Sequence, residues 1–424
     1  MQVGSSVTVA LQQVGPLDGA ANLAGTAVAA LRGVRLPNGL LADVLLDGGL
    51  VAAAPGDGVQ LDASGWRVLP AACEPHAHLD KALTASRLPP GVGNDLVAAC
   101  DSWLVLLPAI DRADVEARAL AAIRRYVARG ITVIRTHVDL HDGRDPFRAV
   151  DALIGLRERL RDRVTLQVCL LAGHETPTEL ITAAAARGVD VMGGCPHLAP
   201  DPRFECRRML DVAQAHDLPV DMHVDEVTDV DLPDDDLDIV ELARQTLARG
   251  LTHPVTASHA VRLGMLPAER LDPVLADVLR AGLGVVTLPI TNLYLQGRDA
   301  THAAPRGLTA VHALLDAGIP LAAGADNVRD PFNAAGRADP FETTSLLQTA
   351  AHLTAEQALH AVTAGARAVL GLPPAGVAPG DVADLLLVPD VDLGDVLAGT
   401  EDARIVLSGG RVVADTRVQR SLEV

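Results

Sequence analysis

Short aliphatic runs alternate with stretches of helical period through the middle of the chain. Most of these runs follow a helical stretch that ends in Gly or Asp, which is typical of helix C-caps. The runs are "WRVLP", "ITVIRTHVDL", "VTLQVCLLAG", "VDVMGG", "PVDMHVDE", "PVTASH", "GVVTLP" and "IPLAAGAD". Eight such strands with their helices, spread over roughly 300 residues, predict an α/β fold of the closed parallel (β/α)8 barrel type.

An open, doubly wound sheet is the main alternative for this alternating pattern. Dinucleotide-binding sheets of that type carry a GxGxxG turn after the first strand. The chain has no such turn at that place, so the closed barrel is favoured.

Both ends of the chain have a different pattern, with short strands between Gly and Asp turns and no helical period. These strands lie in "GLLADVLLDGGLVAAAPGDG", "GDVADLLLVPD" and "ARIVLSGGRVVAD". We expect residues 1–67 and 377–424 to form one small β-sandwich beside a barrel of residues 68–376. About the first 25 residues, rich in Gly, Ala and Ser, are expected to be loosely ordered.

The composition narrows the possible partners. Of the 424 residues 49% are hydrophobic but only 2% are aromatic, so the interior must be built mostly from Ala, Val and Leu. The formal charge is 35 minus 54, or −19, and it is spread along the chain. Such a surface repels nucleic acid and anionic lipid. Small neutral or cationic molecules are the favoured ligands.

The cysteines and the absence of long apolar runs indicate the compartment. The chain has five cysteines, an odd number, and no CxxC pair, which argues against a disulfide framework and a zinc ribbon. Reduced and mostly buried thiols are expected. No basic segment precedes the first apolar residues, and no run of about 18 apolar residues occurs. These features predict a soluble cytoplasmic protein with no membrane partner.

Histidine and acidic side chains follow several of the predicted strands. In a parallel barrel, chemistry takes place at the carboxyl ends of the strands, and the residues there are His76, His78, His137, Asp139, His223, Glu226, His259 and Asp326. Neutral imidazole and carboxylate groups suit a divalent ion such as zinc or iron(II). Three histidines and one aspartate leave a position for a water molecule, whose pKa falls to about 7 on such an ion. Hydrolysis is the expected reaction class.

These residues also carry a family resemblance. The motifs "EPHAHLDK", "RTHVDLHD", "DMHVDE", "VTASHA", "LYLQGR" and "GADNVRDPF" resemble, in order and spacing, the cytosine deaminase branch of the amidohydrolase superfamily. The likeness runs from about residue 38 to the C-terminus. It implies a (β/α)8 barrel with a β-sandwich, one divalent metal ion and a homo-oligomer. It also implies the site residues: metal ligands His76, His78, His223 and Asp326, the proton shuttle Glu226, and His259, which orients the hydroxide.

The chemistry of the residues agrees with these roles. Glu226 lies three residues beyond His223, close enough to pass protons to a substrate at the metal. Asp326 can both bind the metal and accept the proton of the attacking water. Lys81 is expected to be a structural or ion-pairing residue and not the modified lysine that bridges two metals in some relatives, because such lysines come from a later strand. The third and fourth strands contain no lysine, which favours one metal ion.

Several neighbours of the predicted ligands are given supporting roles. His137 and Asp139 match no ligand motif. They are expected to hold the ligands in position without binding the metal themselves. Cys195 and His197 are expected in the pocket wall.

The substrate-reading positions depart from the cytosine deaminase pattern. Cytosine deaminases end the third strand with a glutamine that pairs with the pyrimidine edge, and the best local match is Gly173 followed by His174. Asn327 stands where a second acid is usual, and Phe332 where a tryptophan is common. We therefore expect a small-molecule substrate other than cytosine, an amino- or alkylamino-substituted nitrogen heterocycle such as a triazine, pterin or creatinine-like ring. Its deamination would release ammonia or an amine.

Two other functions remain open at this point. An amidohydrolase that opens a cyclic amide would share the metal site but release no ammonia. A non-catalytic barrel with a scaffold role would not need the full set of site residues, all of which are present.

Overall fold

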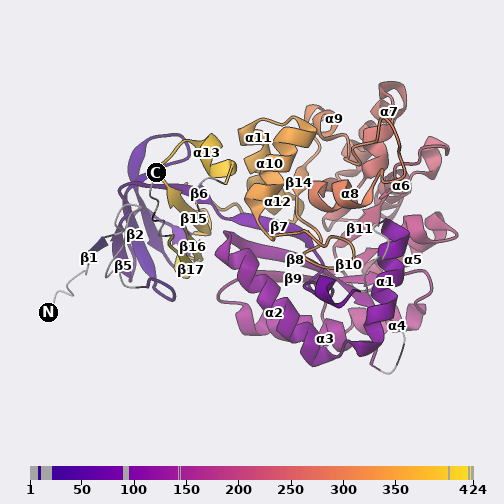
Figure 1. Cartoon of the computed structure of the whole chain (residues 1–424), viewed down its shortest axis with the longest axis horizontal. Coiled ribbons are helices and arrows are strands. Elements are labelled where there is room, and N and C mark those ends of the chain that lie inside the picture. The colour runs from indigo at the N-terminus through magenta and orange to yellow at the C-terminus, as the bar shows by residue number, and fades with distance from the viewer. Residues whose placement is uncertain are drawn as a thin grey trace.

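The computed structural model describes residues 8–10, 22–88, 95–141, 143, 145–399, 402–418 and 421. Most of the N-terminal stretch expected to be loosely ordered lies outside the described residues. The described chain forms a barrel and a separate sheet built from both ends of the chain, so the predicted fold class is confirmed (Figure 1).

The barrel contains eight parallel strands in sequential order. They are β7 (Ala72–Ala77), β8 (Ile131–Leu140), β9 (Thr165–Ala172), β10 (Val191–Gly194), β11 (Val220–Val224), β12 (Val255–His259), β13 (Gly284–Thr287) and β14 (Leu321–Ala323). A parallel bridge between Ala77 and Asp326 joins the first strand to the chain just after the last one. The carboxyl ends of the strands therefore face one end of a nearly closed barrel.

Helices connect these strands and cover the barrel. They are α1 (Leu96–Leu106), α2 (Arg112–Ala128), α3 (Arg148–Leu160), α4 (Thr178–Ala185), α5 (Pro202–Ala215), α6 (Asp238–Arg249), α7 (Ala268–Ala281), α8 (Pro289–Leu295), α9 (Val311–Asp316), α10 (Pro340–Ala351), α11 (Ala355–Val362) and α12 (Ala364–Val369). Gly250 and Gly282 end α6 and α7 in the left-handed conformation that the sequence predicted for C-caps. The main core cluster consists mostly of Leu, Val, Ala and Ile, with Tyr126 as an aromatic member.

The second sheet has the strand order β1-β5-β2-β6-β15-β16-β17, and β3 pairs with β2 and β4. Its N-terminal strands are β1 (Thr8–Ala10), β2 (Val28–Arg35), β3 (Leu41–Asp47), β4 (Leu50–Val51), β5 (Val59–Asp62) and β6 (Trp66–Pro70). Its C-terminal strands are β15 (Leu385–Pro389), β16 (Arg404–Ser408) and β17 (Arg411–Thr416), with the short α13 (Leu393–Leu397) between the first two. Figure 1 shows this sheet beside the barrel.

One predicted barrel strand belongs to the second sheet instead. The run "WRVLP" is β6, which pairs antiparallel with β15 and packs Trp66 and Val68 into the core of that sheet. The first barrel strand is β7, and only Ala71 separates it from β6. The interpretation of this run was wrong because an apolar strand fits either sheet, and because Glu74 and Pro75 hide the strand character of β7. The predicted boundary at residue 67 lies inside β6.

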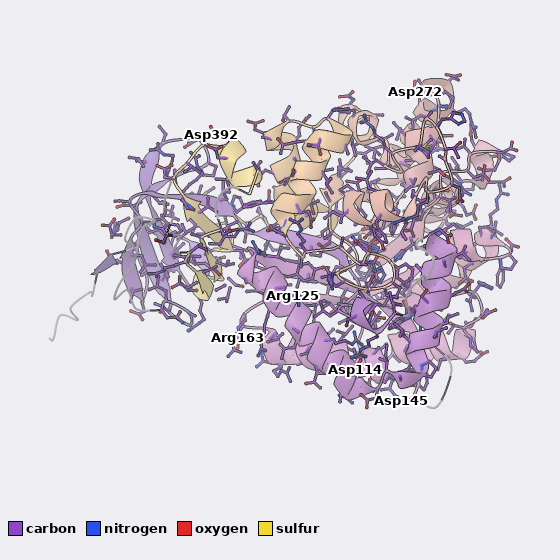
Figure 2. The ribbon with its side chains drawn as sticks, in the orientation of Figure 1. Asp114, Arg125, Asp145, Arg163, Asp272 and Asp392 are labelled. Atoms are coloured by element: carbon purple, nitrogen blue, oxygen red, sulfur yellow. The ribbon has the colours of Figure 1, made fainter. Side chains whose placement is uncertain are left out.

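Charged and sulfur-containing side chains follow the expectations from composition. Exposed charges such as Arg125, Arg163, Asp272 and Asp392 are distributed over the outside of the molecule (Figure 2). All five cysteines are unpaired, and three of them are buried. In the described part of the chain, no helix combines the length and the apolar character needed to span a membrane.

Candidate active site

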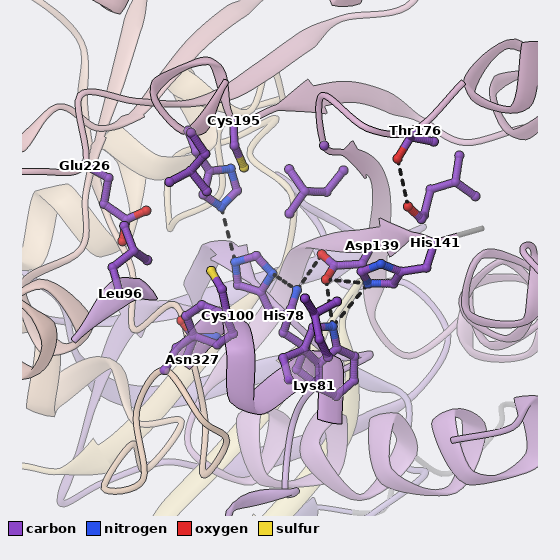
Figure 3. A pocket seen from close by; sticks show the side chains of 18 of the residues that line it. His78, Lys81, Leu96, Cys100, Asp139, His141, Thr176, Cys195, Glu226 and Asn327 are labelled. Atoms are coloured by element: carbon purple, nitrogen blue, oxygen red, sulfur yellow. Dashed lines mark hydrogen bonds and ion pairs between the residues drawn. The ribbon is translucent and has the colours of Figure 1, made fainter. Parts of the chain in front are cut away.

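A cavity of about 340 Å³ opens at the carboxyl ends of the barrel strands. His78, His223, Glu226, His259 and Asp326 line it, together with residues of α1 and of the loops after β8, β9 and β10. Figure 3 shows Glu226 on one side of this pocket and Asp139 with His141 on the other. The pocket therefore brings together side chains from strands that are far apart in the sequence.

Three histidines and Asp326 converge at the inner end of the pocket. The Nε2 atom of His223 lies 3.0 Å from Nε2 of His76 and 3.3 Å from Nε2 of His78. Asp326 Oδ1 lies 3.2 Å from His78 Nε2 and 4.0 Å from His76 Nε2. All four side chains are at most 6% exposed. The predicted ligands therefore form one compact group of donor atoms.

This group has the properties of a site for a divalent cation. Burial lowers the pKa of His76, His78 and His223 well below the usual value, so the rings are neutral, as metal ligands must be. Asp326 Oδ1 is buried and makes no hydrogen bond. Donor atoms of a tetrahedral site with bonds of about 2.0–2.1 Å lie about 3.3 Å apart, similar to the separations found here. The residues present fit the ion that the sequence predicted.

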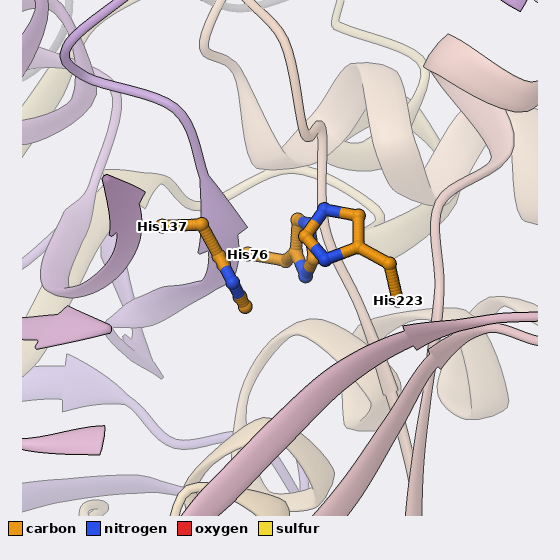
Figure 4. A group of neighbouring side chains, drawn as sticks. All are labelled: His76, His137 and His223. Atoms are coloured by element: carbon orange, nitrogen blue, oxygen red, sulfur yellow. The ribbon is translucent and has the colours of Figure 1, made fainter. Parts of the chain in front are cut away.

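His137 is an alternative member of the cluster. Its ring nitrogens lie close to those of His76 and His223 (Figure 4), and His76, His259 and Asp326 form a second compact group. The rings of His137 and His76 are stacked, however, with centroids 3.8 Å apart and planes at 29°. Stacked rings direct their lone pairs side by side rather than to one point. This geometry favours a supporting role for His137, as its position in the sequence suggested.

A buried hydrogen-bond chain sets the orientation of His76, and the sequence did not reveal it. Ser258 Oγ donates to Asp221 Oδ1 at 2.6 Å, and Asp221 also pairs with Arg135 at 2.9 Å. Because the Ser258 proton goes to Asp221, the 3.0 Å contact with His76 Nδ1 must be a bond that the ring donates. The lone pair of His76 is then on Nε2, which faces the cluster. Asp221 lies two residues before His223 on β11, a same-face spacing that was the available clue.

Glu226 is a buried acid beside the cluster. It is 5% exposed, and burial raises the pKa of its carboxyl group to about 8, so it holds a proton at neutral pH. Its Oε1 lies 3.4 Å from His259 Nδ1, and its Oε2 lies 3.8 Å from His197 Nε2. A protonated carboxyl group in this position can act as a general acid.

His259 and Asp326 face each other from strained backbone positions. Both have left-handed backbone conformations, with φ of 70° and 65°, which residues other than glycine adopt at a cost. Asn292 Nδ2 lies 3.1 Å from His259 Nδ1 and can donate to it. The ring proton is then on Nε2, 4.0 Å from Asp326 Oδ2. Burial raises the pKa of Asp326 well above its usual value, and a nearby cation would restore the charged form.

Lys81 forms the predicted ion pair. Its Nζ lies 2.6 Å from Asp139 Oδ1 and 3.2 Å from His78 Nδ1. Burial alone would lower the pKa of Lys81, but Asp139 and Asp80 raise it above its usual value, so the ammonium group is charged. Trp103 Nε1 also donates to Asp139, at 2.9 Å. Lys81 and Asp139 therefore form a buried ion pair next to the ring of His78.

The three predicted substrate positions line the pocket. Gly173 and His174 are exposed in the loop after β9, and a Cβ added at Gly173 would meet no atom within 4 Å. Asn327 donates an amide hydrogen to Asp330 Oδ2 at 2.8 Å. Gly173 therefore offers no side chain to a substrate in this part of the pocket.

The sequence did not reveal that α1 forms one wall of the pocket. Leu96, Cys100, Trp103 and Leu104 line the cavity, and their spacing places them on one face of the helix. The same spacing would also fit a helix packed on the core. Only the position of α1 over the barrel end assigns this face to the pocket.

Comparisons with known proteins agree with this geometry. A model of the amidohydrolase family matches residues 94–414. The pterin deaminase of Rhizobium rhizogenes is 30% identical over 393 residues, which cover 89% of this chain and 86% of that protein. The N-isopropylammelide isopropyl amidohydrolase of Pseudomonas sp. is 25% identical over 376 residues, 85% of this chain and 89% of that protein.

Solved structures of related enzymes have the same architecture. The 5-methylcytosine deaminase of Klebsiella pneumoniae superposes with a TM-score of 0.84 at 26% identity, covering 93% of this chain and all of that one. The N-isopropylammelide isopropylaminohydrolase of Burkholderia multivorans gives 0.78 at 27% identity with the same coverage. The resemblance predicted from the motifs is confirmed. The chain belongs to the amidohydrolase family and is a hydrolase that acts on carbon–nitrogen bonds.

Proposed function

We propose that the protein is a metal-dependent hydrolytic deaminase of an amino- or alkylamino-substituted nitrogen heterocycle. The main observation in favour of this function is the convergence of three imidazole nitrogens and one carboxylate oxygen in a pocket, with the buried acid Glu226 beside them. The relatives support this reaction class, because their names include a pterin deaminase, a 5-methylcytosine deaminase and an isopropylammelide aminohydrolase. The second product would be ammonia or an alkylamine.

The four converging residues are assigned as metal ligands: His76, His78, His223 and Asp326. A divalent ion held by them, zinc or iron(II), would supply an activated water at neutral pH. One ion per chain is expected, because Lys81 is engaged with Asp139 and does not bridge two metals.

The protein groups around this ion divide the proton transfers between them. Glu226 gives its proton to a ring nitrogen of the substrate when the adjacent carbon is attacked, and it regains a proton from the new hydroxyl group as the carbonyl forms. Asp326 Oδ2 accepts a proton from the attacking water and returns it to the leaving amine. His259 Nε2, which faces Asp326 Oδ2, orients that water.

The pocket favours a substrate other than cytosine. Gly173 offers no side-chain amide to a pyrimidine edge, and sites that read a substrate through such hydrogen bonds lose several kcal/mol when the bond is missing. The cavity wall from Leu96, Cys100, Trp103 and Leu104 gives weaker and less selective contacts. We therefore assign the substrate to the triazine, pterin or creatinine-like rings rather than to cytosine, with His174 and Asn327 as its polar contacts.

A panel of aminated heterocycles tests this assignment. At least one member should be turned over with a kcat/KM about tenfold or more above that of cytosine, a difference of roughly 1.4 kcal/mol. The measurement is release of ammonia or amine. Cytosine turnover as efficient as that of the best alternative would contradict the assignment.

Substitution at Gly173 provides the matched control. Its surroundings leave room for a side chain, so Gly173→Gln should raise kcat/KM for cytosine by about tenfold relative to Gly173→Leu, which has similar size but no amide. Equal effects of the two substitutions would show that this position does not read the ring edge.

Two further properties are proposed for the whole protein. The five unpaired cysteines suit a reducing compartment, so we place the enzyme in the cytoplasm. A homo-oligomer remains a prediction from the family resemblance.

A further inference from the structure

Glu74 is a buried carboxylate in the barrel wall that the proposed chemistry does not use. It belongs to β7, is 2% exposed, and is not among the residues that line the pocket. Burying a carboxyl group costs free energy unless hydrogen bonds compensate for it, so its partners indicate its role.

One partner lies in an irregular part of β7. The pairing of β7 with β8 is in register at Glu74 and at Ala77, with a shift between them. Pro75, inside this bulge, has no N–H group. The N–H of the next residue, His76, donates to Glu74 Oε1 at 3.2 Å. Glu74 therefore fixes the backbone that carries one of the proposed metal ligands.

The other partners lie across the seam of the barrel. Within the described residues, β7 and the chain after β14 are joined by one isolated bridge, from Ala77 to Asp326. The N–H of Ala325 donates to Glu74 Oε2 at 2.9 Å, and the N–H of Asp326 is a further donor to the same carboxylate. Asp326 needs such support, since a left-handed backbone is strained for residues other than glycine and persists only where its surroundings hold it.

Gly324 provides the space for this contact. A Cβ at this position would overlap Glu74 Oε1 and press against the ring of Pro75. The carboxylate thus passes directly over the backbone of residue 324 to reach the two amides beyond it.

We propose that Glu74 is a positioning residue whose carboxylate bridges the first and last barrel strands and fixes His76 and Asp326 relative to each other. The proposal rests on the proposed function, because it takes these two residues as ligands of one metal ion. Without the bridge, the two donor groups would separate, and metal binding would weaken although no pocket residue has changed.

Glu74→Gln tests the proposal, because it keeps the shape of the side chain but turns an amide N–H toward a backbone N–H. We expect the metal dissociation constant, measured by competition with a chelator, to rise by about 10- to 100-fold, as is typical for groups that hold ligands in place. Asp190→Asn is the matched control. Asp190 also accepts a barrel backbone N–H, from Val168 at 2.7 Å, but it lies before β10, at the opposite end of the barrel. This variant should bind metal within about twofold of the wild type.

Gly324→Ala is a second route to the same contact, because its methyl group displaces the carboxylate. In the double variant with Glu74→Gln, the metal dissociation constant should equal that of the single variant that binds the metal more weakly. It should not rise by the product of the two single effects. Wild-type metal affinity in Glu74→Gln, or full additivity of the two substitutions, would overturn the proposal.

Amide hydrogen exchange tests the bridge in the unmodified, metal-free protein, even where the variants do not fold. The N–H groups of His76 and Ala325 should exchange as slowly as those of the barrel ladders. Rapid exchange at both would overturn the bridge. If the wild type binds no divalent ion, the proposed function fails instead, and slow exchange would still support the bridge between the strands.

Discussion

Glu226→Gln should lower the turnover of the preferred heterocycle by about 100-fold or more, with the metal content unchanged. Glutamine keeps the size of the side chain but has no proton to give to the ring nitrogen. The effect should fall mainly on kcat, because the carboxyl group acts as the bond to the ring carbon changes. Steady-state kinetics and elemental analysis of the same preparation measure both quantities.

The control for this variant is Glu175→Gln. Glu175 is an exposed acid at the pocket mouth and should leave kcat within about twofold. Burial raises the pKa of Glu226 to about 8, so its proton is present at neutral pH and is lost as the pH rises through that value. The wild-type kcat should therefore fall above about pH 8. Turnover of Glu226→Gln near the wild-type value would show that another residue supplies the proton.

Removing the metal should lower activity by on the order of 1,000-fold, because a divalent ion contributes several kcal/mol to the stabilisation of the transition state. Protein purified without added metal should contain about one zinc or iron ion per chain. Dialysis against a chelator should remove both ion and activity, and one equivalent of zinc or iron(II) should restore them.

Two outcomes would contradict the single-ion site. Recovery of activity that requires two equivalents would mean that a second ion takes part, for which neither the β9 nor the β10 strand offers a bridging lysine. Full activity of the metal-free protein would mean that the converging histidines are not ligands.

Much of the site could be predicted because its residues lie at or just after the ends of strands that the sequence pattern identifies. His76 and His78 share a face at the end of β7, and His223, His259 and Asp326 end or follow later strands. Once the parallel barrel was inferred, these side chains had to meet at its carboxyl end. The structure brings their atoms within about 3–4 Å of each other.

The other features of the fold and the site could not be predicted from the spacing of apolar and polar residues along the chain. The apolar run of β6 fits either sheet, and only its pairing with β15 assigns it to the second one. The pocket face of α1 has the same spacing as a core-facing helix. The role of Glu74 depends on contacts with Ala325, 251 residues away in the chain. Long-range contacts of this kind leave no local pattern.

Reaction in water labelled with oxygen-18 tests hydrolytic deamination most directly. With the best substrate of the heterocycle panel, we predict a product that has gained one labelled oxygen at the ring carbon and lost one nitrogen. One molecule of ammonia or amine should be released per product, and the metal-free protein should form the product on the order of 1,000-fold more slowly. A product that gains the labelled oxygen but keeps every nitrogen would contradict deamination, because it would identify the enzyme as one that opens a cyclic amide.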